Sequence, residues 1–237
     1  MTLKRLFVFL MITGAIFWSC SDDSGNGTGP SSTEEPPELN VEFPTLPEKM
    51  QQSNDPHAQQ VKTYLMIANN MSNTYLAYVI PPANAGNGDM NYTWTDGEVT
   101  VHLDISESGN TIEWKVRFSG SDGEHTYDNW LAMEAQRNKA GTQSSFVIYE
   151  KGIEGPAATF DYNKDDADTQ SYDFKAYGST GIRLLAAVNA DSSGWAEQYE
   201  YMDNQFVLNE KYEWDAQGNG EWWNYNTDGS VSASGTW

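Results

Sequence analysis

Short stretches in which apolar and polar residues alternate fill most of the chain after Asn91. Between Val99 and Ile105, for example, every second residue is apolar and the residues between are Thr, His or Asp. This period of two is typical of β-strands that bury one face. Turn signals such as Asp96-Gly97 and Asp228-Gly229 separate the stretches and predict antiparallel hairpins in series. The predicted strands lie near residues 99–105, 114–118, 130–136, 145–150, 158–162, 171–177, 182–188, 195–202, 206–214, 221–225 and 230–237.

A helix is expected before these strands. Asp55-Pro56 supplies a capping residue followed by proline at the first helical position, and Pro81-Pro82 ends the pattern. We therefore expect a mainly β fold with an N-terminal α-helix, in which a curved antiparallel meander of about eleven strands, open or half-barrel-like, packs on the helix. The apolar residues at helical spacing are Val61, Tyr64, Leu65, Ala68, Met71, Tyr75 and Val79.

A transmembrane barrel is the alternative architecture, since its strands also alternate. The predicted strands are mostly shorter than the usual length of about nine to eleven residues, and barrels of this kind do not need an amphipathic helix. The helix-covered meander is therefore the favoured interpretation.

The first twenty residues have the order of a secretory signal. Lys4 and Arg5 form a positive segment, and a mostly apolar segment runs from Leu6 to Trp18. At about 1.5 Å per residue this segment is about 20 Å long, shorter than a hydrocarbon core of about 30 Å. We expect residues 1–19 to be a signal peptide that is removed on export.

Cys20, the single cysteine of the chain, directly follows this segment. Together with the small Ser19 before it, Cys20 resembles the lipobox of bacterial lipoproteins. The resemblance implies a diacylglycerol on the Cys20 thiol, cleavage before this residue and acylation of the new amine, and hence a lipid-anchored protein. Asp22 and Asp23 resemble the export signal of surface lipoproteins of the Bacteroidetes type. The resemblance covers residues 1–23 and implies the outer membrane, with its periplasmic and cell-surface faces both open as locations.

Residues 20–47 have the composition of a lipidated, disordered tether. They are rich in Ser, Asp, Gly, Pro and Glu, with almost no large apolar residue before Val41 and Phe43. Such a segment buries too little surface to offset the entropy of ordering. A single helix-plus-β-meander domain is therefore expected over residues 48–237.

The charge of the chain bears on its partners. It has 13 basic and 34 acidic residues, a net charge of −21. This field repels nucleic acid and anionic lipid headgroups, which makes both poor partners. It favours solubility, a cationic ligand or a divalent metal ion.

No catalytic motif stands out. The three histidines, His57, His102 and His125, lie outside any recognised motif, so catalysis is not supported by the sequence. Asp161, Asn163 and Asp165 alternate as at the start of an EF-hand loop, which makes them candidate Ca²⁺ ligands. Because the sixth and twelfth positions of that loop are not those of an EF-hand, a solvated hairpin loop is favoured instead.

Trp222 and Trp223 must point to opposite faces of a strand. Trp223 shares its face with Tyr225 and is the expected core residue. Trp222 shares its face with Asn224 and Asn226, a pattern that suits stacking on a sugar ring and hydrogen bonds to its hydroxyls. Packing of Trp222 under a loop or against the helix is the alternative.

These patterns leave three hypotheses of function. The leading one is a non-enzymatic binding or envelope-structural module anchored to the outer membrane, with a glycan or an envelope protein as partner. The second is a carrier of hydrophobic ligands, because an open barrel with a helix lid resembles the periplasmic lipoprotein-carrier fold. The third is a cell-envelope enzyme that acts on glycans through carboxylates. A filled core with an aromatic patch would indicate the binding module, an empty apolar cavity the carrier, and a wet cleft with paired carboxylates the enzyme.

Overall fold

The structure is a computed structural model that describes residues 37–39, 41–83, 85–88 and 90–237. The described residues belong to one compact unit, Pro36–Trp237. The predicted signal peptide and Cys20 lie outside the described residues.

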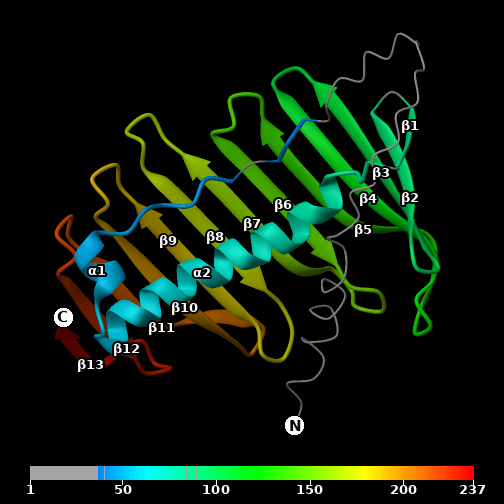
Figure 1. Cartoon of the computed structure of the whole chain (residues 1–237). Helices are drawn as coiled ribbons and strands as arrows, with labels where there is room; N and C mark the ends of the chain where they lie inside the picture. The colour runs from blue at the N-terminus through cyan, green and yellow to red at the C-terminus, as the bar shows by residue number, and fades with distance from the viewer. Residues whose placement is uncertain (1–36, 40, 84, 89) are drawn as a thin grey trace. The chain divides into compact units, whose positions relative to one another are not determined.

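In this part of the chain, thirteen antiparallel strands form one open sheet, and each strand pairs with its neighbours in sequence (Figure 1). The predicted open antiparallel meander is therefore confirmed. Two of the strands, β1 and β2, precede the first predicted one. The sequence does not predict them, because the pattern of Tyr92 and Trp94 is too short to be distinctive. The strands are β1 (Gly86–Gly88), β2 (Asn91–Asp96), β3 (Val99–Ser108), β4 (Thr111–Ser121), β5 (Thr126–Asn138), β6 (Gln143–Tyr149), β7 (Pro156–Lys164), β8 (Gln170–Ala176), β9 (Ile182–Val188), β10 (Gly194–Met202), β11 (Gln205–Trp214), β12 (Gly220–Tyr225) and β13 (Val231–Thr236).

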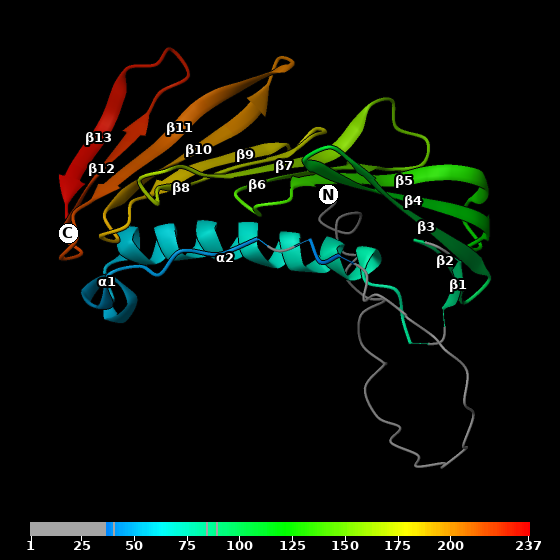
Figure 2. The ribbon, with the colours of Figure 1, turned by 90° about the horizontal axis from the view of Figure 1, so that it is seen from above.

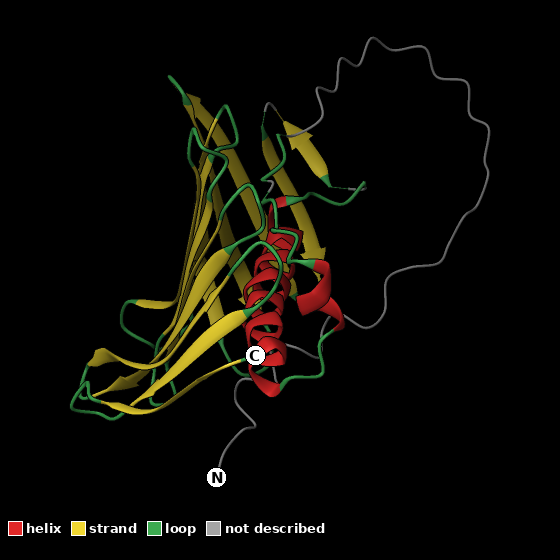
Figure 3. Ribbon diagram, turned by 90° about the vertical axis from the view of Figure 1, so that its left-hand side faces the viewer, coloured by secondary structure: helices red, strands yellow, loops and turns green. Residues whose placement is uncertain are grey.

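The predicted helix is α2 (Pro56–Leu76), which continues into a 3₁₀ turn, Ala77–Val79. Asp55 caps it as expected, because its Oδ1 accepts a hydrogen bond of 2.9 Å from the backbone N–H of His57. Helix α2 crosses the strands and lies against one face of the sheet, which curves around it (Figures 2 and 3). We call this the inner face. A short helix that the sequence did not predict, α1 (Glu48–Gln52), precedes α2.

Helix α2 meets the sheet through the apolar positions that its spacing predicted. Val61 is fully buried, and Tyr64, Leu65 and Ala68 are at least nine-tenths buried. Tyr64 also donates a hydrogen bond to the carboxylate of Glu210 on β11, which accepts a second one of 2.8 Å from Tyr212. This shared acceptor holds the N-terminal half of α2 against the end of the sheet where β11 lies.

The inner face of the sheet carries the hydrophobic core in a row that crosses the strands. Trp114 and Phe160 are fully buried, and the rings of Phe146 and Phe160 stack with centroids 5.0 Å apart. Large aromatic side chains therefore occupy the space between α2 and the sheet. The row consists of the cross-strand neighbours Trp114, Ala135, Phe146, Phe160, Phe174 and Leu184.

Leu39 and residues 41–47, which the sequence analysis assigns to the tether, also pack on the domain. The ring of Phe43 stacks on Tyr172 at 5.5 Å, and the Tyr172 hydroxyl donates a hydrogen bond of 2.9 Å to the backbone oxygen of Glu42. Leu39 and Leu46 are both at least nine-tenths buried. The C-terminal part of the predicted tether therefore belongs to the folded unit, because its few apolar residues are enough to dock it on the strand ends.

The opposite, outer face of the sheet is uncovered. Both α1 and α2 lie on the inner side, so in the described part of the chain no helix packs on the outer face (Figure 2). The outer side chains of the sheet are therefore not covered by a described helix.

Candidate functional site

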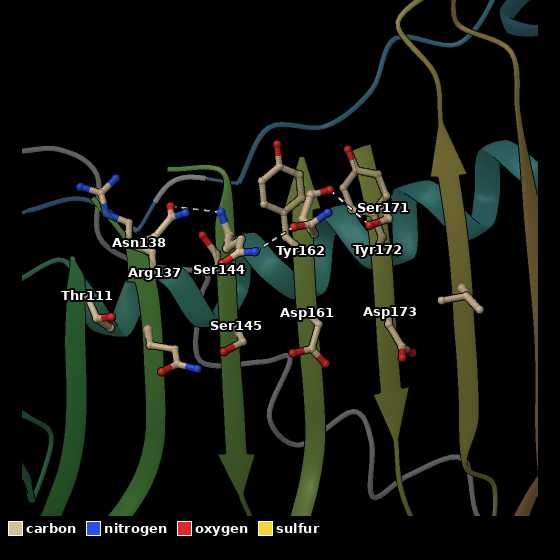
Figure 4. Close-up of a pocket in the computed structure, with 14 residues that line it drawn as sticks. Thr111, Arg137, Asn138, Ser144, Ser145, Asp161, Tyr162, Ser171, Tyr172 and Asp173 are labelled. Atoms are coloured by element: carbon tan, nitrogen blue, oxygen red, sulfur yellow. Dashed lines mark hydrogen bonds between the residues drawn. The ribbon is translucent and has the colours of Figure 1, made fainter. Parts of the chain in front are cut away.

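A shallow groove of about 390 Å³ crosses strands β4 to β9 on the outer face (Figure 4). Alternation along each strand decides which side chains enter the groove. Those that do are short and polar, which is why the surface is hollow here. The side chains that define this outer groove are Gln136, Ser145, Asp161, Asn163, Ser171 and Asp173.

The register of the sheet brings these residues together. Gln136, Ser145, Asp161 and Asp173 are successive cross-strand neighbours on β5, β6, β7 and β8. Figure 4 shows Ser145, Asp161 and Asp173 side by side at the same level of their strands. The intervening residues of the same strands, such as Tyr162, form the floor of the groove while their side chains lie on the inner face. The site is therefore a product of strand pairing rather than of any local motif.

Both carboxylate oxygens of Asp173 pair with positively charged side chains of the protein. Arg183 binds it in a bidentate manner, with Nε to Oδ1 and Nη2 to Oδ2 both at 2.8 Å, and Lys175 Nζ lies 2.8 Å from Oδ2. Burial raises the pKa of the Asp173 carboxyl, but the hydrogen bonds from Arg183 and Lys175 outweigh this effect and hold the pKa below its ordinary value. Asp173 therefore stays ionised and internally neutralised.

Asp161 is the opposite case. Among the described residues it takes part in no hydrogen bond or ion pair, although it lies directly across from Asp173. Desolvation raises the pKa of the Asp161 carboxyl; Lys175 opposes this rise and the negative charge of Asp173 adds to it. Asp161 is thus the carboxyl group of the outer groove that is free to bind a ligand.

An aromatic side chain continues one row of the groove. Asn163 and Ser171 are cross-strand neighbours, and the row runs on through Ala187 of β9 to Trp195 of β10. Ala187 is small, so a ligand can pass from the polar groove to the partly exposed Trp195 without an obstacle in this row. The outer face therefore combines hydrogen-bonding groups with an aromatic surface.

The predicted sugar-binding residues lie elsewhere. Trp222 is on the inner face, where its ring stacks on His57 with centroids 4.0 Å apart and planes 6° apart. Trp223 is on the outer face, with the Lys211 ammonium group 5.6 Å from its ring centroid. The predicted facing of the two tryptophans is therefore wrong. Sharing a face with Tyr225 does not place Trp223 in the core, because Tyr225 lies near the edge of the sheet and does not belong to the core.

The two amides predicted to accompany Trp222 do not make an exposed sugar surface with it. Asn224 follows Trp222 on the inner face, whereas the side-chain amide of Asn226 donates a hydrogen bond of 3.0 Å to the Ser230 hydroxyl in the β12–β13 turn. The alternative that the sequence left open, packing of Trp222 against the helix, is what the structure shows.

The three candidate calcium ligands do not lie together in one site. Asp161 and Asn163 lie in the outer groove, where the Asn163 side-chain oxygen accepts a hydrogen bond of 3.2 Å from Gln143. Asp165 lies in the β7–β8 turn, and its Oδ1 accepts hydrogen bonds of 2.9 Å from the backbone N–H groups of Ala167 and Thr169. Within the described ranges, no three His, Cys, Asp or Glu side chains are grouped so that they could hold a metal ion.

Comparisons with known proteins give no guide to the site. No protein-family model matches this chain, and no curated protein matches it. Among the described residues, no helix is both long enough and apolar enough to cross a membrane.

The contributions of the two groove aspartates to stability should change with pH in opposite directions. Asp173→Asn should lower the free energy of unfolding by about 1–3 kcal/mol at neutral pH, because Arg183 and Lys175 lose an ionised partner. Since the pKa of Asp173 is lower in the folded state than in the unfolded state, this stabilisation is present above the ordinary pKa. It is lost as the pH falls toward the lower, folded-state value. Urea unfolding of wild type and variant between neutral and acidic pH measures this difference.

Asp161→Asn is the matched control. The pKa of Asp161 is raised in the folded state, so its contribution to stability is present at low pH and is lost as the pH rises through the folded-state value. Relative to wild type, the Asp161 variant should therefore gain stability with rising pH, whereas the Asp173 variant should lose it. Parallel profiles for the two variants would contradict the assigned roles.

Proposed function

We propose that this protein is a non-enzymatic glycan-binding module, held at the outer membrane by lipid on Cys20, and that the outer groove is its binding site. The observation that carries the proposal is the row of short polar side chains around the unpartnered Asp161 on an uncovered sheet face. The ligand is a polyhydroxylated molecule whose hydroxyls bind these side chains.

The chemistry of the groove suits sugar hydroxyls. Each hydroxyl can both donate and accept a hydrogen bond, and the groove offers a carboxylate, amides and hydroxyls that cover both roles. Asp161 supplies a charged acceptor, and hydrogen bonds to charged groups are the stronger ones. The apolar face of a sugar ring stacks well on an aromatic side chain, which Trp195 provides along the row of Asn163 and Ser171.

Binding without hydrolysis follows from the pairing of Asp173. A glycosidase needs two carboxyl groups, one as acid and the other as base or nucleophile. Asp161 and Asp173 are neighbours, but both oxygens of Asp173 accept hydrogen bonds from Arg183 or Lys175. A carboxylate engaged in this way is a weak base and a weak nucleophile. The paired carboxylates therefore support recognition rather than catalysis.

The carrier hypothesis receives less support. A carrier needs an apolar cavity on the inner face, and in this protein the side chains of Trp114, Phe146 and Phe160 are almost fully buried there beneath α2. A hydrophobic ligand would have to displace this core. The outer face is the accessible surface instead.

The proposed lipid anchor holds the binding domain at the membrane. The lipobox resemblance of residues 1–23 supports attachment through Cys20, and the acidic residues behind it support export to the cell surface. A binding domain on a tether suits the capture of glycans near the membrane.

The glycan proposal is tested by binding to a panel of oligosaccharides. Asp161→Ala and Trp195→Ala should each weaken binding about tenfold or more, because each removes a strong contact to the sugar. Asp128→Ala and Trp223→Ala are the matched controls, since both side chains lie outside the groove, and they should bind like wild type. If no glycan binds wild type, or if all four variants bind alike, the proposal is wrong.

The anchor is tested in cells with a fatty-acid probe. Wild type should be labelled, and Cys20→Ala should not be, because the thiol is the predicted site of acylation. Protease treatment of intact cells then distinguishes the two faces of the membrane: degradation supports the cell surface. Label that persists in the Cys20 variant would contradict the anchor.

A further inference from the structure

A second hollow adjoins the outer groove on the same face of the sheet. It has a volume of about 310 Å³ and lies over β4, β5 and β6. Gln136 and Ser145 line both hollows, so the two form one continuous trough across the strands. Glu113 of β4 lines the part of the trough that lies beyond Gln136. A ligand in the outer groove can therefore extend past Gln136 to Glu113.

Strand pairing places one carboxylate at each end of a straight row in this trough. Glu113, Gln136, Ser145 and Asp161 are successive cross-strand neighbours on β4, β5, β6 and β7. Because neighbouring strands lie about 4.8 Å apart, the backbones of Glu113 and Asp161 are about 14 Å apart. The row is therefore a polar path that begins and ends at a carboxylate.

Neither of these two carboxylates has a partner in the protein. Among the described residues, Glu113 takes part in no hydrogen bond or ion pair, and the same is true of Asp161. Glu113 is partly buried, and partial desolvation raises the pKa of Asp161. A carboxylate that loses water without gaining a cation costs free energy, which a cationic ligand would offset.

The lysines beside the row have carboxylates of their own as neighbours. Lys175 Nζ lies 2.8 Å from Oδ2 of Asp173. Lys115 lies between Asp104 and Glu134, its cross-strand neighbours on β3 and β5. In the part of the chain that the structure describes, neither lysine forms an ion pair with the carboxylates at the two ends of the row. Both ends of the trough therefore keep a negative charge, in a chain whose net charge is −21.

We propose that the ligand of the trough is an oligosaccharide with free amino groups, which bind Glu113 and Asp161 as ammonium ions. This rests on the proposed glycan-binding function and adds the class of glycan. An ammonium group donates hydrogen bonds and carries a positive charge, so it matches an ionised carboxylate. Between the two ends, Gln136 and Ser145 offer an amide and a hydroxyl for the hydroxyls of the sugar. A short oligosaccharide that lies across the strands reaches both carboxylates.

Two probes of equal length test this assignment: the tetrasaccharide of glucosamine, and its fully N-acetylated counterpart, which carries no charge. Titration calorimetry is done at about pH 6 and low ionic strength, where amino groups are protonated. Wild type should bind the glucosamine probe about tenfold more tightly, because two ion pairs are gained. This difference should shrink at high salt, since salt screens exposed charges.

Variants show whether the two carboxylates cause the difference. Glu113→Gln and Asp161→Asn each remove one charge and keep the size of the side chain. Each should weaken binding of the glucosamine probe about threefold and affect the N-acetylated probe less. Both variants should fold, because neither carboxylate has a partner to lose. Asp128→Asn, which lies outside the trough, is the control and should bind both probes like wild type.

The possible failures can be told apart. Equal affinities for the two probes, or glucosamine binding that neither variant weakens, would show that the ligand is not an amino sugar and leave the glycan proposal intact. Spermine has amino groups without a sugar, and equally tight binding of spermine would overturn the assignment to a sugar. If neither probe binds while another oligosaccharide does, the amino-sugar assignment alone is wrong. If no oligosaccharide binds, the glycan-binding function is wrong as well.

Discussion

A sheet with one apolar face needs a cover for that face, and here a single helix supplies it. The inner row from Trp114 to Leu184 crosses six strands, and α2 lies against it along the direction in which the row runs. Burial of this inner row is the main source of stability, because a chain with one cysteine has no internal disulfide. The aromatic side chains also fix the register, because a slip of one residue would expose all of them at once. Everything on the outer face is positioned by this register.

The outer groove is a consequence of this strand register. Once β5 to β8 are held in register, Gln136, Ser145, Asp161 and Asp173 must lie in one line, whatever their separation in sequence. The two aspartates then differ only through their neighbours. Arg183 and Lys175 neutralise Asp173, which stabilises the sheet, and Asp161 has no such partner among the described residues. The same face thus supports the fold with one carboxylate and presents the other to solvent.

Sequence patterns predicted the fold well because its signals are local. Asp55 caps α2 as expected, and the alternation from Val99 onward marks the strands and their antiparallel order. The facing of Trp222 and Trp223 was mistaken, since one strand near the sheet edge cannot show which side α2 covers. His57, which lies 165 positions earlier in the chain, decides it by stacking on Trp222. The groove was beyond sequence reasoning for a related reason: only Asp161 and Asn163 were singled out, and the other members join them through pairing across four strands.

The central claim is that the outer face, and not the helix-covered face, is where this protein binds its ligand. Backbone-amide NMR spectra recorded during a titration with the tightest-binding oligosaccharide test it directly, because they report every strand at once. The account predicts shifts concentrated in β5 to β8 around Gln136, Ser145, Asp161 and Ser171, extending to Trp195. Shifts confined to α2 or to the surroundings of Trp222, with the groove amides unchanged, would contradict it.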